Sequence, residues 1–224
     1  MSMASVIKGI VRGTVDEERN VAVSSGGSVF TRKYLPDYAQ LVAEGRVWRA
    51  QEATGTASVV ALPTTASLFT LGNNEPDDGL WYVVLALYAF NGANAAAIDN
   101  FGLAASISQL PATTGGIDPT LTQDIAKTSI KNMLSVRGGG YVGRAIIDTG
   151  VTITDDLWFP VTPGSGSTAV ASATGGASIF HMVNGLIILP PKGLLGLVST
   201  ATSTSNTTRK GIIWAEVTRK ELVG

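Results

Sequence analysis

The C-terminal third of the chain alternates short apolar segments with loops of small residues, and this pattern restricts the fold more than any other feature. The apolar segments lie at residues 185–191, 193–199 and 211–217, and a Ser/Thr run that ends at Thr208 separates the last two. Each segment has the length of a strand and is too short for a typical buried helix. We predict three successive antiparallel strands, which are typical of an all-β domain and carry nothing that resembles a reaction centre.

Strand signals recur along the rest of the chain between turn signals such as Asn91-Gly92. They lie at residues 47–50, 58–62, 67–71, 80–90, 103–108, 141–147, 157–161 and 178–183. At least eight strands separated by turns are typical of a two-sheet sandwich such as a jelly roll. Residues 121–136 fit either a helix or an irregular loop with a strand, and both alternatives stay open.

The N-terminal part of the chain has a different character. Residues 1–33 hold most of the local charge and a flexible turn signal, so we predict an extended arm or a lead-in strand there. One short helix is predicted at about residues 36–44, because apolar residues recur at helical spacing and Gly45 follows as a C-cap would. We therefore divide the chain into residues 1–45, the arm and helix, and residues 46–224, a jelly-roll-like two-sheet antiparallel sandwich.

The composition bears on the class of partner. Charged residues make up only 15% of the chain and hydrophobic residues 45%. A monomer normally presents more charge to water, so this balance favours a homo-oligomer or a larger assembly; the alternative is a monomer rich in small residues. A net charge of −1 provides no basic surface for phosphate, so no nucleic-acid partner is expected. The longest apolar run, residues 80–90, is shorter than a spanning helix requires, so no membrane partner is expected.

Compartment and redox chemistry follow from two further features. The chain has no cysteine, which excludes a disulfide framework and a thiolate metal site. Its first ten residues combine one lysine with weak hydrophobicity, which is not the pattern of a secretion signal. We expect the protein to be made in the cytoplasm of its cell and to stay there or leave by lysis.

Few residues are candidates for catalysis or ligand binding. Gly138–Gly140 with Gly143 match the spacing of a dinucleotide-binding loop, but the residues that follow are strand-like, so a hairpin or bulge is the preferred interpretation. His181 is the only histidine, and its place between Phe180 and Met182 in an apparent strand favours a packed or interface role over a general base.

Carboxylates and tryptophans complete the set of candidates. Five acids lie beside turns, where they could be calcium ligands or ordinary solvated residues, and the second interpretation is preferred; they are Glu75, Asp77, Asp78, Asp155 and Asp156. Trp48, Trp81, Trp158 and Trp214 lie in apolar strands, where core packing is expected, with Trp158 as the exposed exception that would suit a sugar ring. We predict no catalytic residue, no cofactor and no metal site, and we expect that the chain is not an enzyme.

Two parts of the sequence resemble a known class of protein. Residues 185–193, followed by a strand, a Ser/Thr-rich turn and the strand at 211–217, are similar to the C-terminal portion of jelly-roll virion proteins of tailed bacteriophages. The segments at 45–50 and 64–71 fit the opening of the same domain. The resemblance spans residues 45–224 and carries no site residues.

This resemblance to virion proteins implies a structural function in a phage particle. It implies a homotrimeric head cement or decoration protein that binds the major capsid protein at the outer capsid surface and stabilises the shell. The alternative is a receptor-binding or glycan-binding module of a tail or fibre. For the cement protein, the arm is expected to reach the shell or a sister subunit, with Arg12, Arg19 and Arg32 as ion-pair donors; the alternative for the arm is a disordered tail.

Overall fold

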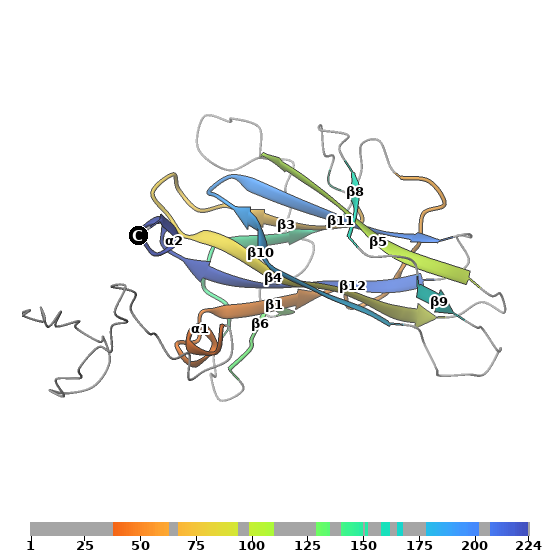
Figure 1. Cartoon of the computed structure of the whole chain (residues 1–224), viewed down its shortest axis with the longest axis horizontal. Coiled ribbons are helices and arrows are strands. Elements are labelled where there is room, and N and C mark those ends of the chain that lie inside the picture. The colour runs from red at the N-terminus through yellow and green to blue at the C-terminus, as the bar shows by residue number, and fades with distance from the viewer. Residues whose placement is uncertain are drawn as a thin grey trace, which may run out of the picture. The chain divides into compact units, whose positions relative to one another are not determined.

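The computed structural model of the chain divides it into two compact units, Met1–Gln40 and Leu41–Gly224. The structure describes residues 38–62, 67–93, 99–109, 129–134, 140–149, 151, 158–161, 165–167, 178–201 and 207–223 (Figure 1). The arm predicted for residues 1–33 and most of the ambiguous segment 121–136 lie outside the described residues.

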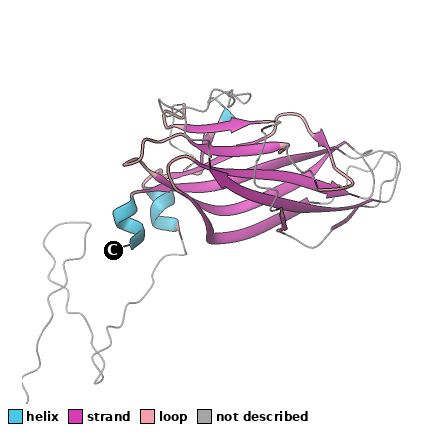
Figure 2. Ribbon diagram, turned by 90° about the horizontal axis from the view of Figure 1, so that it is seen from above, coloured by secondary structure: helices cyan, strands magenta, loops and turns pink. Residues whose placement is uncertain are grey.

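Strands make up most of the described chain, and the helices are short (Figure 2). The helices are α1 (Ala39–Ala43) and α2 (Arg219–Val223). The described strands are β1 (Val47–Gln51), β2 (Thr56–Ala57), β3 (Phe69–Asn73), β4 (Trp81–Ala93), β5 (Asp99–Gln109), β6 (Lys131–Asn132), β7 (Ala145–Asp148), β8 (Phe159–Pro160), β9 (Ser165–Ser167), β10 (Ser178–Leu189), β11 (Gly193–Ala201) and β12 (Thr207–Val217).

The strands form two sheets that pack as a sandwich (Figure 1). The first sheet has the order β10-β4-β12-β1-β6, with β2 also paired to β12, and the second has the order β7-β3-β11-β5-β8, with β9 also paired to β5. Every pairing between these strands is antiparallel. The predicted all-β, two-sheet antiparallel sandwich is therefore confirmed.

The order in which the chain visits the sheets is that of a jelly roll. Strands β1, β4, β10 and β12 lie in the first sheet, and β3, β5, β8 and β11 lie in the second. In chain order the path through these eight strands changes sheet at every step except from β5 to β8. This alternation produces the two nested Greek keys of a jelly roll and places both sheets' inner faces against one core.

The end of α1 shows how glycine stops the helix where the sequence predicts. Gly45 has a φ of 71°, which a residue without Cβ adopts at little cost. The Gly45 N–H donates to the Val42 carbonyl at 2.9 Å, and the Arg46 N–H donates to the Leu41 carbonyl at 2.9 Å. These two bonds form a Schellman cap, so the predicted C-cap is confirmed, while α1 itself is shorter than the predicted 36–44.

Some predicted elements differ from the observed ones. The separate strands expected at 178–183 and 185–191 are one strand, β10, with a register shift between Met182 and Ile187. The strand expected at 58–62 is reduced to one isolated bridge between Val59 and Thr200, because the chain crosses here from β2 in the first sheet to β11 in the second. Helix α2 was not predicted at all.

Candidate functional site

The most exposed apolar surface on a single strand follows β10. Its side chains alternate, so that Ile179, Val183, Ile187 and Leu189 are buried while the even-numbered residues from 178 to 188 are exposed. The outward set includes Phe180, Met182, Leu186 and Ile188, which are 61%, 48%, 89% and 39% exposed. We call these four residues the apolar stripe. Within the described residues, β10 is the end strand of its sheet, so the stripe lies at a sheet edge.

An aromatic row extends the stripe toward the middle of the sheet. Tyr88 of β4 lies opposite Phe180, and their rings stack with centroids 6.0 Å apart at an interplanar angle of 19°. The Tyr88 ring then passes over Gly211 of β12, where an added Cβ would collide with it, and its hydroxyl donates to Gln51 Oε1 at 3.3 Å. Burial raises the pKa of the Tyr88 phenol. Glycine at 211 is thus what lets the ring lie flat on the sheet.

The stripe carries no charge. Strand β10 contains no Asp, Glu, Lys or Arg, and its one titratable side chain, His181, is half-buried opposite Leu87 of β4. Natural edge strands are commonly protected by charged residues, proline or bulges. Strand β10 has a bulge, at which Asn184 and Gly185 adopt φ values of 52° and 82°, but its outward face lacks charge. A surface of this kind is suited to contact with another apolar surface.

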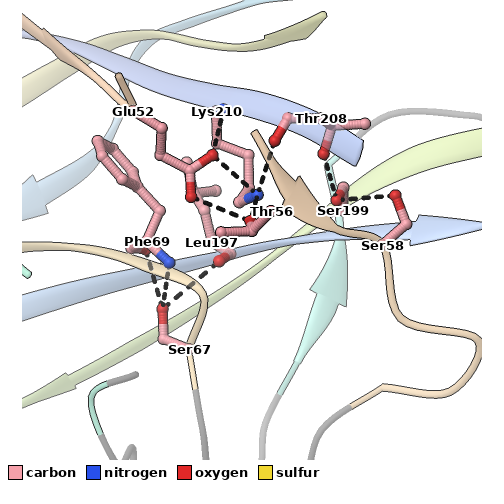
Figure 3. A network of polar contacts seen from close by, with 9 residues as sticks. All are labelled: Glu52, Thr56, Ser58, Ser67, Phe69, Leu197, Ser199, Thr208 and Lys210. Atoms are coloured by element: carbon pink, nitrogen blue, oxygen red, sulfur yellow. Dashed lines mark hydrogen bonds and ion pairs between the residues drawn. The ribbon is translucent and has the colours of Figure 1, made fainter. Parts of the chain in front are cut away.

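A polar cluster lies buried at one end of the sandwich interior (Figure 3). Lys210 Nζ and Glu52 Oε2 are 3.0 Å apart, and the two side chains are 0% and 3% exposed. Lys210 Nζ also donates to Thr56 Oγ1 at 2.6 Å, and Thr56 Oγ1 in turn donates to Glu52 Oε1 at 3.1 Å. The second lone pair of Glu52 Oε2 accepts the backbone N–H of Lys210 at 2.8 Å. The cluster therefore fixes the segment after β1 against β12.

Neighbouring hydroxyl groups connect the two sheets at the same end. Thr208 of β12 donates to Ser199 Oγ of β11 at 2.5 Å, and the Ser199 and Ser58 hydroxyl oxygens are 3.1 Å apart. Ser67 donates to the Phe69 carbonyl at 2.9 Å, which holds the turn into β3 (Figure 3). Because these groups satisfy one another, the end of the sandwich can bury polar atoms without a large cost.

Lys210 is the buried side chain whose chemistry comes nearest to that of a catalytic nucleophile. Burial lowers the pKa of its ammonium, while the contact with Glu52 opposes this change. A lysine with a lowered pKa can act as a nucleophile when a substrate reaches it. Lys210 has no exposed side-chain surface, and its ammonium already donates to Thr56 Oγ1, to the Thr208 carbonyl at 3.3 Å and to Glu52. These contacts favour a structural role over catalysis.

A second buried cluster surrounds Glu216 near the other end of β12. Tyr141 donates to Glu216 Oε1 at 2.5 Å, and Trp214 Nε1 donates to the same oxygen at 3.4 Å. The Tyr141 hydroxyl also accepts the Ala145 N–H at 3.0 Å, and its oxygen lies 3.4 Å from that of Tyr82. Burial raises the pKa of the Glu216 carboxyl, and the hydrogen bonds from Tyr141 and Trp214 partly oppose this shift. The pKa values of both tyrosines are raised, chiefly by burial.

Glu216→Gln should therefore change how stability depends on pH. Because the folded-state pKa of Glu216 is raised above its ordinary value of 4.5, the stabilising contribution of its proton is complete below that value and is lost as pH rises through the folded-state pKa. In that window the wild-type protein should lose up to about 1.4 kcal/mol of unfolding free energy per pH unit relative to Glu216→Gln. Urea unfolding at a series of pH values measures this difference. Asp78→Asn removes an exposed carboxylate and serves as the control; parallel profiles for Glu216→Gln and wild type would contradict the account.

The structure places the sequence candidates as follows. Trp48 and Trp214 are buried in the core, which confirms the packing prediction for these two, and Trp81 is half-buried. Trp158, expected to be exposed, is half-buried, and its indole N–H is covered without a hydrogen-bond partner among the described residues. The side chain is therefore less available to a ligand than the sequence indicated, because neighbouring atoms already cover its polar edge.

The remaining candidates do not form a site in the described part of the chain. Asp77 and Asp78 are exposed and Glu75 is half-buried in the turn before β4, and the described residues hold no group of three or more potential metal ligands. Gly143, the last glycine of the candidate dinucleotide-binding motif, lies against the Tyr141 ring in an irregular segment before β7. Other candidates lie outside the described residues, namely Arg12, Arg19, Arg32, Asp155, Asp156, Gly138 and Gly139.

Two further findings concern membrane-spanning helices and similarity to known proteins. Among the described residues, the helices are too short or too polar to cross a membrane. Neither a protein-family model nor a curated protein matches the chain.

Proposed function

We propose that this protein is a non-enzymatic structural protein of a tailed-phage virion, of the cement or decoration type, which binds the outer capsid surface as an oligomer. The observation that carries the proposal is the apolar stripe, four large uncharged side chains displayed along one edge strand. Exposed patches of this kind mark surfaces that bind other proteins. The resemblance of residues 45–224 to jelly-roll virion proteins supplies the setting.

The physical basis of such a function is buried area. A cement protein that binds only the assembled shell stabilises it by mass action, because internal pressure must then break additional contacts. This work requires a rigid scaffold and a contact surface and no catalytic group. The sandwich supports it, since buried polar clusters at both ends of β12 hold neighbouring strands in register.

Electron microscopy of particles from the source of the chain, labelled with an antibody against the protein, tests this proposal. Regular labelling over the head is the expected result. Labelling confined to the tail tip would contradict the cement function and favour the receptor-binding or glycan-binding alternative. Particles without label would contradict a virion function altogether.

A further inference from the structure

We infer that the partner of the apolar stripe is the same stripe on a second copy of this chain, packed face to face about a two-fold axis. The inference rests on the proposed function in one respect, that the protein acts as an oligomer, and it assigns the stripe to the contact between chains and not to the contact with the shell. It goes further because it names the partner and the symmetry. A self-contact of this kind joins two chains.

The chemistry of the stripe selects an uncharged partner. A charged partner group would lose its water against Phe180, Met182, Leu186 and Ile188, and β10 offers no counter-charge to compensate. The stripe of a second copy meets the same requirement from the other side, since it is equally apolar and equally free of charge. Each copy therefore presents a surface complementary in polarity to its own.

The order of residues along β10 is compatible with two-fold symmetry. Asn184 is exposed between the pair Phe180 and Met182 and the pair Leu186 and Ile188. A two-fold axis through this position places the first pair of one copy against the second pair of the other. It also brings the two Asn184 amides together, and an amide supplies both donors and acceptors, so the two groups can satisfy each other.

The area available predicts a weak dimer. Taking about 200 Å² for a fully exposed large side chain, the exposed fractions of the stripe correspond to roughly 470 Å² per copy. A standard interface buries about 800 Å² per partner. The half-buried Tyr88 ring beside Phe180 adds a little to the stripe. The contact therefore falls below the roughly 1,200–2,000 Å² total of stable interfaces and in the range of weak ones, so the dimer should dissociate on dilution.

Sedimentation equilibrium of the full chain over a range of concentrations tests the inference. The wild-type protein should approach twice the chain mass of 23.1 kDa as concentration rises. Leu186→Glu places a charge at the most exposed position of the stripe and should weaken the dimer at least tenfold. The matched control is Val142→Glu, because Val142 is 92% exposed but lies before β7 in the other sheet. This variant should dimerise as the wild type does, and circular dichroism should show both variants folded.

The contrary outcomes are distinct. A wild-type mass of one chain or of three chains at all concentrations would overturn the inference, as would a dimer that Leu186→Glu leaves intact or that Val142→Glu weakens equally. Single chains that still label phage heads would overturn the inference and the oligomeric state, and would leave the cement function itself standing. Stripe-dependent dimers with no label on any particle would support the inference and contradict the proposed function.

Discussion

Glu52→Ala is expected to lower the free energy of unfolding by about 3–5 kcal/mol, because it leaves the ammonium of Lys210 buried without its counter-charge. The pair is 3.0 Å apart and almost completely excluded from solvent. The substitution also removes the acceptors of the Thr56 hydroxyl and of the Lys210 backbone N–H. Urea unfolding at pH 7 measures the loss.

Two controls separate the buried charge from ordinary side-chain truncation. Combining Glu52→Gln with Lys210→Met removes both charges and should recover most of the lost stability, since neutral replacements of a buried pair are often tolerated. Glu221→Ala breaks a more exposed ion pair, in which Glu221 Oε2 lies 2.8 Å from Arg46 Nη2, and should cost only about 0–1 kcal/mol. Equal losses in Glu52→Ala and Glu221→Ala would contradict a special role for the buried pair.

Tyr141→Phe is expected to cost about 2–4 kcal/mol, because one hydroxyl serves two buried groups. It donates to Glu216 Oε1 at 2.5 Å and accepts the Ala145 N–H at 3.0 Å, so its removal leaves a buried carboxylate and a buried N–H without this partner. The ring itself, in edge contact with Trp48 at 4.8 Å, is retained in phenylalanine. Thermal and urea unfolding of the variant measure the effect.

Tyr82→Phe is the matched control for this prediction. Tyr82 is equally buried, but its hydroxyl makes only a long contact of 3.4 Å with the Tyr141 oxygen. Its loss should cost less than about 1 kcal/mol. A Tyr82→Phe variant as unstable as Tyr141→Phe would contradict the prediction that the Tyr141 hydroxyl contributes more to stability than the Tyr82 hydroxyl.

Elements defined by local pattern could be predicted from the sequence. The run at 80–90 is too long and too apolar for a loop, and it forms β4 in the middle of its sheet. Gly45 marks the end of α1 because a positive φ is a local requirement that glycine meets. Burying one face of each strand in a single core then predicts a two-layer sandwich, but it does not predict the alternation of sheets between successive strands.

Elements defined by long-range pairing could not be predicted. Asn184-Gly185 has the composition of a turn, and both residues have positive φ, yet Ile187 pairs again with β4 and the strand continues. A bulge and a hairpin present the same local sequence, and only the neighbouring strand distinguishes them. The prediction of two strands in place of β10 failed for this reason.

The buried polar clusters illustrate the same limit. Lys210 and Glu216 share the inward face of β12 with Trp214, so extending the alternation of the predicted strand would have marked both as buried. Their partners could not be found in this way. Glu52 and Lys210 are 158 residues apart, and the contact exists because β1 and β12 pair in a register that no local pattern specifies.

The apolar stripe could not be predicted from the sequence for a different reason. Both faces of β10 are apolar, so the sequence does not show that Phe180 and Leu186 point to solvent while Ile179 and Ile187 point to the core. An alternation of apolar with polar residues would have identified the outer face. Here the outward position depends on the register with β4, which the structure supplies.

The central claim is that the outer face of β10 is a contact surface between two copies of the chain, and methionine oxidation tests it by comparing two methionines of the same protein. Met182 lies in the stripe and is 48% exposed, while Met133 lies beside β6 and is 40% exposed. Peroxide oxidation at high and low protein concentration, followed by mass spectrometry, compares the two. The account predicts that Met182 reacts several-fold more slowly in the concentrated protein and that Met133 reacts at one rate throughout. Equal rates for Met182 at both concentrations would contradict it.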